Sequence, residues 1–182
     1  MALEPMFLKR IPSKLCDIAT VEYESLEPHD AAMNRDTASR MDHAQRNTTV
    51  YFGESWDWFG AIMYSAGLEG NVKNQWDFFL NSHEAVQFAV YNEGQHYNWH
   101  VDTFLLSGQQ LDRKVTVVCL MNDPSEFEGG VLELQFHGKT YTPMLRKGSI
   151  IVFPAYILHR VTPVTHGVRK SAVMWLSGPA FK

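Results

Sequence analysis

The chain has 182 residues, of which 45% are apolar, 13% aromatic and 20% charged, and its formal net charge at neutral pH is -4. This length supports one domain with a sizeable core, and the composition excludes an intrinsically disordered chain. The charges form no basic stripe and no apolar run approaches about 18 residues, so we expect neither a nucleic-acid partner nor a membrane span.

The N-terminal segment and the cysteines indicate the compartment. Met1 to Arg10 lacks the apolar run of a signal peptide. Cys119 lies in an apolar run that is typical of a buried strand, and Cys16 is the only other cysteine. We therefore predict two reduced core thiols and a cytoplasmic protein.

The first 83 residues predict helices and a few early strands. Helix-forming residues with weak helical apolar spacing occur in Asp30 to Arg46 and in Glu54 to Ala66. We expect residues 1–83 to support residues 84–182 within a single domain that spans residues 1–182.

From Glu84 onward the pattern changes to short β-rich runs separated by turn residues such as Gly129-Gly130. Eight runs are predicted as strands: Glu84 to Tyr91, Tyr97 to Leu106, Val115 to Met121, Val131 to Phe136, Thr140 to Met144, Ser149 to Phe153, His159 to Val161 and Val168 to Leu176. Short strands at this spacing predict a mainly β fold, either a sandwich or a closed double sheet.

A candidate metal site begins with His100 and Asp102. They are separated by one residue in a strand-like run, so both side chains are expected on one face of that strand. His159, at the end of a later apolar run, can supply a third ligand. Two histidines and one carboxylate leave open positions on an octahedral ion, which is typical of non-haem iron(II) oxygenases, whereas structural zinc favours a closed tetrahedral set.

A candidate anion site follows the metal site along the chain. Arg169, Ser171, Val173 and Trp175 alternate along one predicted strand and share a face. An arginine and a hydroxyl that point into a pocket beside an open metal form a site for a carboxylate. The alternative is a surface salt bridge for Arg169 and a solvated Ser171.

These motifs, taken in order, resemble the prolyl-4-hydroxylase type of iron(II) and 2-oxoglutarate dioxygenase, and in particular its bacterial and phage hydroxylases. The resemblance covers about residues 86–175. The motifs that carry it are Tyr91 to Asp102, Asn122-Asp123-Pro124, Phe127 to Gly130, Gly148 to Pro154, His159 and Arg169-Lys170-Ser171.

The resemblance implies a double-stranded β-helix, or jelly roll, as the catalytic core in residues 84–182. It implies iron(II) ligation by His100, Asp102 and His159, and a salt bridge from Arg169 to the C5 carboxylate of 2-oxoglutarate. It also implies O2 as co-substrate and ascorbate as a candidate reductant. Tyr91 matches a tyrosine that reaches the co-substrate or the primary substrate.

The sequence departs from some relatives in one respect. They carry a co-substrate-binding tyrosine on the strand that corresponds to Val115 to Met121, and this chain has none there. Ser171 or Tyr91 is left to complete the carboxylate site. Asp102 favours hydroxylation, because related halogenases have a small residue in its place.

The neighbours of His100 and the loop that follows it have two interpretations each. Trp99 and Val101 are expected in the core, because a regular strand directs them away from His100. Asn98 shares the ligand face and either touches substrate or makes a structural hydrogen bond. Thr103 to Lys114 is either a mobile loop beside the metal or a plain surface connection.

Three functions remain open at this level. The first is hydroxylation of a prolyl residue in a peptide, coupled to decarboxylation of 2-oxoglutarate to succinate. The second is the same chemistry on a free amino acid or another small metabolite. The third is a jelly-roll module that binds 2-oxoglutarate or a carbohydrate without turnover.

Overall fold

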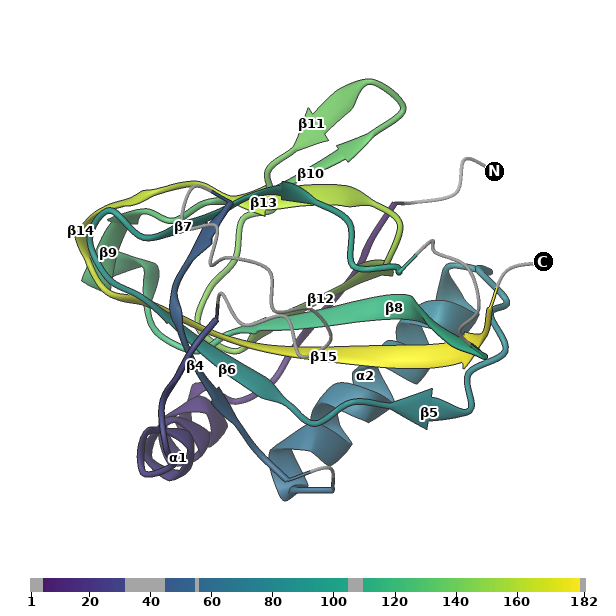
Figure 1. The fold of residues 1–182 in the computed structure, drawn as a ribbon, viewed down its shortest axis with the longest axis horizontal. Helices are drawn as coiled ribbons and strands as arrows, with labels where there is room; N and C mark the ends of the chain where they lie inside the picture. The colour runs from purple at the N-terminus through teal and green to yellow at the C-terminus, as the bar shows by residue number, and fades with distance from the viewer. Residues whose placement is uncertain (1–4, 32–44, 55, 105–109, 181–182) are drawn as a thin grey trace.

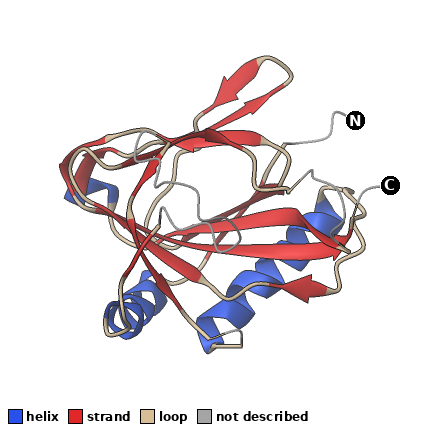
Figure 2. Ribbon diagram, in the orientation of Figure 1, coloured by secondary structure: helices blue, strands red, loops and turns tan. Residues whose placement is uncertain are grey.

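Two antiparallel β-sheets lie over one another, and two α-helices cover the outer face of the larger sheet (Figures 1 and 2). The computed structural model describes residues 5–31, 45–54, 56–104 and 110–180. The prediction of a mainly β fold with supporting helices is confirmed. None of the described helices is long and apolar enough to cross a membrane.

The larger sheet has the strand order β1-β12-β8-β15-β6-β4-β2, and β5 pairs with β15 beside this path. Its strands are β1 (Phe7–Arg10), β2 (His29–Asp30), β4 (Thr49–Phe52), β5 (Ser82–His83), β6 (Gln87–Tyr91), β8 (Leu111–Leu120), β12 (Ser149–Pro154) and β15 (Arg169–Pro179). Strands from the first 83 residues therefore pair directly with strands of the later part of the chain.

The smaller sheet has the strand order β11-β10-β13-β7-β3, and β14 pairs separately with β9. These strands are β3 (Arg46–Asn47), β7 (His96–His100), β9 (Phe127–Gly129), β10 (Leu132–Phe136), β11 (Lys139–Tyr141), β13 (Leu158–Val161) and β14 (Val164–Gly167). A 3-10 turn, η1 (Pro124–Glu126), precedes β9.

Side-chain alternation divides the interior into two apolar clusters. On β8, Val115, Val117 and Cys119 face the helices, whereas Val118 belongs to the cluster between the sheets. Thr116 shares the inner face with Val118 and lines a pocket there. Because successive side chains of a strand point to opposite faces, one strand can supply both the core and the pocket.

The helices α1 (Ser13–Glu24) and α2 (Trp58–Lys73) pack against the outer face of the larger sheet. Asp57 caps α2 by accepting a hydrogen bond from the backbone N–H of Gly60. Gly67 allows close approach, because a Cβ at that position would lie 2.8 Å from Leu176 Cδ2 and 2.9 Å from Val117 Cγ2.

Several predicted elements differ from the structure. A helix was expected in Asp30 to Arg46, but residues 32–44 lie outside the described residues. Asp30 belongs to strand β2, and Arg46 belongs to strand β3. The helix expected in Glu54 to Ala66 begins only at Trp58, after its cap, and extends to Lys73. Helix α1 was not predicted, because it has neither a side-chain cap nor an acidic first turn to mark its start.

The region after His100 also differs from the prediction. Strand β8 begins at Leu111 rather than Val115, so Leu111 to Lys114 belong to the sheet and not to the expected loop. Residues 105–109 of that loop lie outside the described residues. The prediction of two buried free cysteines is confirmed for Cys16 and Cys119.

Candidate functional site

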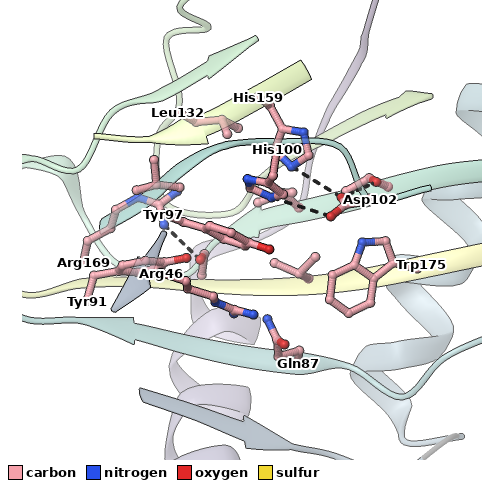
Figure 3. A pocket seen from close by; sticks show the side chains of 15 residues that line it. Arg46, Gln87, Tyr91, Tyr97, His100, Asp102, Leu132, His159, Arg169 and Trp175 are labelled. Carbon is pink, nitrogen blue, oxygen red and sulfur yellow. Dashed lines mark hydrogen bonds and ion pairs between the residues drawn. The ribbon is translucent and has the colours of Figure 1, made fainter. Parts of the chain in front are cut away.

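A pocket lies between the two sheets (Figure 3). Its walls include the six residues to which the sequence assigned a role, namely Tyr91, His100, Asp102, His159, Arg169 and Ser171. The larger sheet supplies Tyr91, Arg169 and Ser171, and the smaller sheet supplies both histidines. The candidate site is therefore formed by residues of both sheets, in the space between them.

The candidate metal ligands converge at one point of this pocket. His100 ends β7 and lies opposite His159 of β13 in the strand register. Nε2 of His100 is 3.6 Å from Oδ1 of Asp102, and Nε2 of His159 is 3.4 Å from Oδ2. One candidate ligand atom from each of the three residues lies within 4.8 Å of the others.

Both imidazole rings are oriented by their own stretch of backbone. Nδ1 of His100 donates to the carbonyl of Asn98 at 2.7 Å, and Nδ1 of His159 donates to the carbonyl of Ile157 at 2.8 Å. When the ring is neutral, Nδ1 holds the proton and Nε2 has a lone pair for a metal. Burial alone would lower the pKa of His159, but the Asp102 carboxylate outweighs it and raises this pKa. Burial and the neighbouring His159 lower the pKa of His100 to about 4, which keeps this ring neutral at neutral pH.

Asp102 is held by hydrogen bonds that the sequence did not reveal. Its Oδ2 accepts a hydrogen bond from Thr116 Oγ1 at 2.7 Å, and its backbone N–H donates to the carbonyl of Ala155 at 2.8 Å. Burial alone would raise the pKa of Asp102, but His159 and His100 outweigh it and hold this pKa well below its ordinary value. The carboxylate is therefore ionised and fixed in direction.

The expectation that His100 and Asp102 share one strand is wrong. Strand β7 ends at His100, and Asp102 follows it outside regular secondary structure. The register between β7 and β13 also shifts between the pairs His100–His159 and Tyr97–Val161, so β7 contains one extra residue. Bulges of this kind change which side chains share a face.

The bulge brings Tyr97 to the face of His100. Their rings stack with centroids 3.4 Å apart and planes 9° apart. Trp99 and Val101 are only half-buried, so the expectation that they lie in the core is wrong. The prediction that Asn98 shares the ligand face is wrong, because Asn98 is exposed and does not line the pocket.

The candidate anion site contains a fully buried guanidinium group. Arg169 is 2% exposed, and its Nη1 donates to Ser171 Oγ at 2.9 Å. The Arg169 guanidinium carbon lies 5.4 Å from the ring centroid of Tyr91, which is opposite it on β6. Burial lowers the pKa of Arg169. The alternative of a surface salt bridge is excluded, because Arg169 has no carboxylate partner within the described ranges.

Three polar residues of the pocket, Arg46, Gln87 and Thr116, were not predicted from the sequence. Arg46 fell in a stretch predicted as a helix, and its neighbour across the strands, Tyr97, is far away in sequence. Thr116 left a weak signal, as a lone hydroxyl inside the apolar run Val115 to Met121. A polar residue at an inward position of a buried strand is a reason to look for a bonding partner.

Comparison with known proteins agrees with this geometry. The sequence model described as the 2OG-Fe(II) oxygenase superfamily matches residues 86–177, which is half of the chain. The chain belongs to this superfamily. The resemblance to the prolyl-4-hydroxylase type is confirmed by relatives named PKHD-type hydroxylases, and solved prolyl hydroxylase structures share the fold.

Two relatives show the extent of the sequence similarity. A PKHD-type hydroxylase of Thermosynechococcus vestitus is 44% identical over 92 residues, which are 49% of this chain and 41% of that protein. One of a Picosynechococcus species is 36% identical over 109 residues, covering 60% of this chain and 49% of that protein. The chain thus matches less than half the length of these relatives.

Two solved structures share the fold over nearly the whole chain. A prolyl-4-hydroxylase of Pseudomonas putida has a TM-score of 0.74 at 18% identity, covering 97% of this chain and 94% of that one. A viral collagen prolyl hydroxylase from Paramecium bursaria Chlorella virus-1, in its 2OG complex, has a TM-score of 0.69 at 18% identity, covering 96% and 97%. The predicted jelly roll is confirmed.

The residues present fit the cofactors of the superfamily. Two imidazoles and one carboxylate form the donor set that iron(II) oxygenases use, and both free Nε2 atoms point toward Asp102. Arg169 still has N–H groups beyond the one that Ser171 accepts, and these suit a planar carboxylate.

Proposed function

We propose that this chain is an iron(II)- and 2-oxoglutarate-dependent hydroxylase, with the metal held by His100, Asp102 and His159. Arg169 and Ser171 bind the C5 carboxylate of 2-oxoglutarate, and Tyr91 contacts that end of the co-substrate. The observation that carries the proposal is one pocket with a metal-donor triad and a buried arginine that lacks a carboxylate.

Bound iron and 2-oxoglutarate supply the oxidising chemistry, in which O2 is consumed, 2-oxoglutarate is decarboxylated to succinate and a substrate carbon gains a hydroxyl. The chain contributes position and environment. His100 and His159 present fixed donors, and Thr116 holds Asp102. The apolar cluster between the sheets, with Val118, Leu132 and Val161 at the pocket, excludes water from the reacting groups.

We infer that the primary substrate is a prolyl residue of a peptide. The names of the structural neighbours, which are prolyl hydroxylases and in one case hold a peptide fragment, support this choice. A free amino acid or another small metabolite is the second candidate, because the same pocket chemistry serves both. Ascorbate as reductant and a cytoplasmic location belong to this proposal, and the free thiols of Cys16 and Cys119 suit a reducing compartment.

The cofactor part is tested by adding iron(II) and 2-oxoglutarate without oxygen and recording the visible charge-transfer band of the chelate. We expect the band in the wild type, none in His100→Ala, and a far higher 2-oxoglutarate requirement in Arg169→Ala. Arg10→Gln removes an exposed positive charge from β1 and serves as control. Absence of the band in folded, metal-loaded wild type would refute the oxygenase proposal and favour a module without turnover.

The substrate part is tested by presenting proline-containing peptides and free proline in parallel, with 2-oxoglutarate, iron(II) and oxygen. Mass spectrometry then detects the gain of one oxygen. Oxidation of the peptides alone supports the prolyl peptide proposal, and oxidation of free proline alone supports the second candidate. Oxidation of neither, in protein that forms the band, excludes both named substrates.

A further inference from the structure

A second guanidinium group lines the pocket in addition to Arg169. Arg46 extends from β3, directly opposite Tyr97 of β7, and its guanidinium carbon lies 4.6 Å from the centroid of that ring. Its Nε is buried and has no hydrogen-bond partner among the described residues. No carboxylate pairs with Arg46 in the part of the chain that the structure describes.

The carboxylate of Asp102 is the only one among the described residues that line the pocket, and the proposed function already uses it. Iron(II) brings two positive charges and 2-oxoglutarate two negative ones, while Asp102 adds one negative charge and Arg169 one positive. These four groups are neutral together, since both histidines bind as neutral rings. Arg46 is left with an unmatched positive charge in a partly desolvated position.

We propose that Arg46 binds a carboxylate of the primary substrate, so that the substrate is an acid whose anionic group lies close to the hydroxylated carbon. This proposal rests on the proposed function and adds the substrate's charge to it. Gln87 supplies a second polar group, and Figure 3 shows its side chain and that of Arg46 pointing toward one another beneath Tyr97. An arginine fork and an amide N–H match a carboxylate well.

The strands that carry these residues fix their positions. Backbone hydrogen bonding within the β3–β7 pair and a bond from Asn98 N–H to the Gln45 carbonyl at 2.8 Å tie Arg46 to the strand of Tyr97 and His100. Arg46 therefore lies over the ring of Tyr97, which in turn stacks on the metal ligand His100 with ring centroids 3.4 Å apart. A carboxylate bound there places the adjoining carbon atoms beside the metal ligands.

Two sources can supply such a carboxylate, namely the acidic side chain of a residue near the proline and the α-carboxylate of a free amino acid. The first is tested with capped proline peptides in matched pairs, which differ only by Glu or Gln at one flanking position. The second is tested with proline against prolinamide. Both sets are given to wild type, Arg46→Gln, Arg46→Lys and the control Arg10→Gln.

The dissociation constants are measured without oxygen, from the change that each compound causes in the charge-transfer band, and turnover is measured afterwards as succinate formed. We expect wild type and Arg10→Gln to prefer at least one acid over its amide by about 10- to 100-fold. Arg46→Gln should lose this preference and keep the band, and Arg46→Lys should retain part of it. A purely structural role of Arg46 would lower the affinity for acids and amides alike.

Three results would overturn the carboxylate proposal while the band persists: no acid preferred in wild type, a preference that survives in Arg46→Gln, or no acid bound at all. Loss of the band from wild type is a different result. It would refute the proposed cofactor site, so the two failures can be told apart.

Discussion

Asp102 depends on a few individual contacts, because it follows β7 in a segment without regular structure. The hydroxyl of Thr116, which is fully buried on β8, donates to the same oxygen that lies nearest His159. Partners of this kind orient a ligand without touching the metal, and their loss typically weakens metal binding by about 10- to 100-fold.

We therefore predict that Thr116→Val lowers the affinity for iron(II) by about tenfold and leaves the fold intact, since valine has nearly the same shape. Titration of iron(II) into anaerobic protein with saturating 2-oxoglutarate measures this affinity. Thr116→Ser, which keeps the hydroxyl, should bind iron nearly as well as wild type. Equal affinities in the valine and serine variants would contradict the role given to this hydroxyl.

Residues with a distinctive local pattern were predictable from the sequence, and residues defined by contacts between distant segments were not. His100, Asp102 and His159 stood out by residue type and spacing, as did Arg169 with Ser171. The role of Thr116 was not predictable, because its hydroxyl reaches Asp102 only when β8 has folded next to that residue. Arg46 required the pairing of β3 with β7, which no local periodicity encodes.

At the scale of elements, a buried tyrosine of α1 forms a hydrogen bond with the residue that caps α2. Tyr23 of α1 is 4% exposed, and its hydroxyl donates to Oδ2 of Asp57, the cap of α2, at 2.7 Å. Burial and this bond to Asp57 raise the pKa of Tyr23 well above its ordinary value. The folded state therefore favours the protonated phenol.

This pKa shift makes the free energy of unfolding depend on pH in the alkaline range. Because the folded-state pKa is raised, the contribution of Tyr23 is complete below about pH 10 and is lost above it, where the unfolded chain ionises first. Tyr23→Phe should cost about 1 kcal/mol of unfolding free energy at neutral pH, and this difference from wild type should shrink between about pH 9 and 11.

Urea unfolding at several pH values measures this difference. Tyr64→Phe, which removes the hydroxyl of a half-buried tyrosine of α2, is the matched control for the loss of a phenol. A difference between Tyr23→Phe and wild type that stays constant up to pH 11 would contradict the prediction.

The element boundaries show where local patterns were insufficient. The bulge in β7 places Tyr97 and His100 on one face although they are three residues apart, so a strict alternation rule misassigned Asn98. A bulge depends on the partner strand β13, and its position cannot be read from the sequence of β7 alone. Helix α1 was missed for a similar reason, since packing against the sheet rather than a cap defines it.

At the scale of the whole molecule, the proposed metal joins parts of the chain that are far apart in sequence. His159 on β13 and the segment that ends β7 would be tied together, and Asp102 is in turn bonded to β8 of the other sheet. A ligand that binds only the folded state stabilises it by mass action.

We predict that anaerobic iron(II), at about 100 times its dissociation constant, stabilises the protein by about 2.7 kcal/mol. For a chain of this size the expected rise in Tm is about 5–10 °C. Differential scanning calorimetry with and without the metal measures it, and His159→Ala should show almost no rise. An equal rise in that variant would mean that the stabilising metal binds elsewhere.

The overall architecture was the most predictable level. Turn residues and apolar alternation from Glu84 onward indicated a double sheet, because many short strands with a buried inner face have few other ways to close. The strand pairs of the first 83 residues were not predicted, since β2 and β3 have only two residues each and no measurable periodicity.

The two backbone carbonyls that hold Nδ1 of His100 and His159 have a consequence for engineering. Each of these hydrogen bonds closes within a stretch of three residues, Asn98 to His100 or Ile157 to His159. One aromatic ring then supports each imidazole, Tyr97 on His100 and Phe153 on His159. A designer who copies these two short backbone paths, each with its aromatic neighbour, onto facing strands of another scaffold should obtain correctly aimed nitrogen donors.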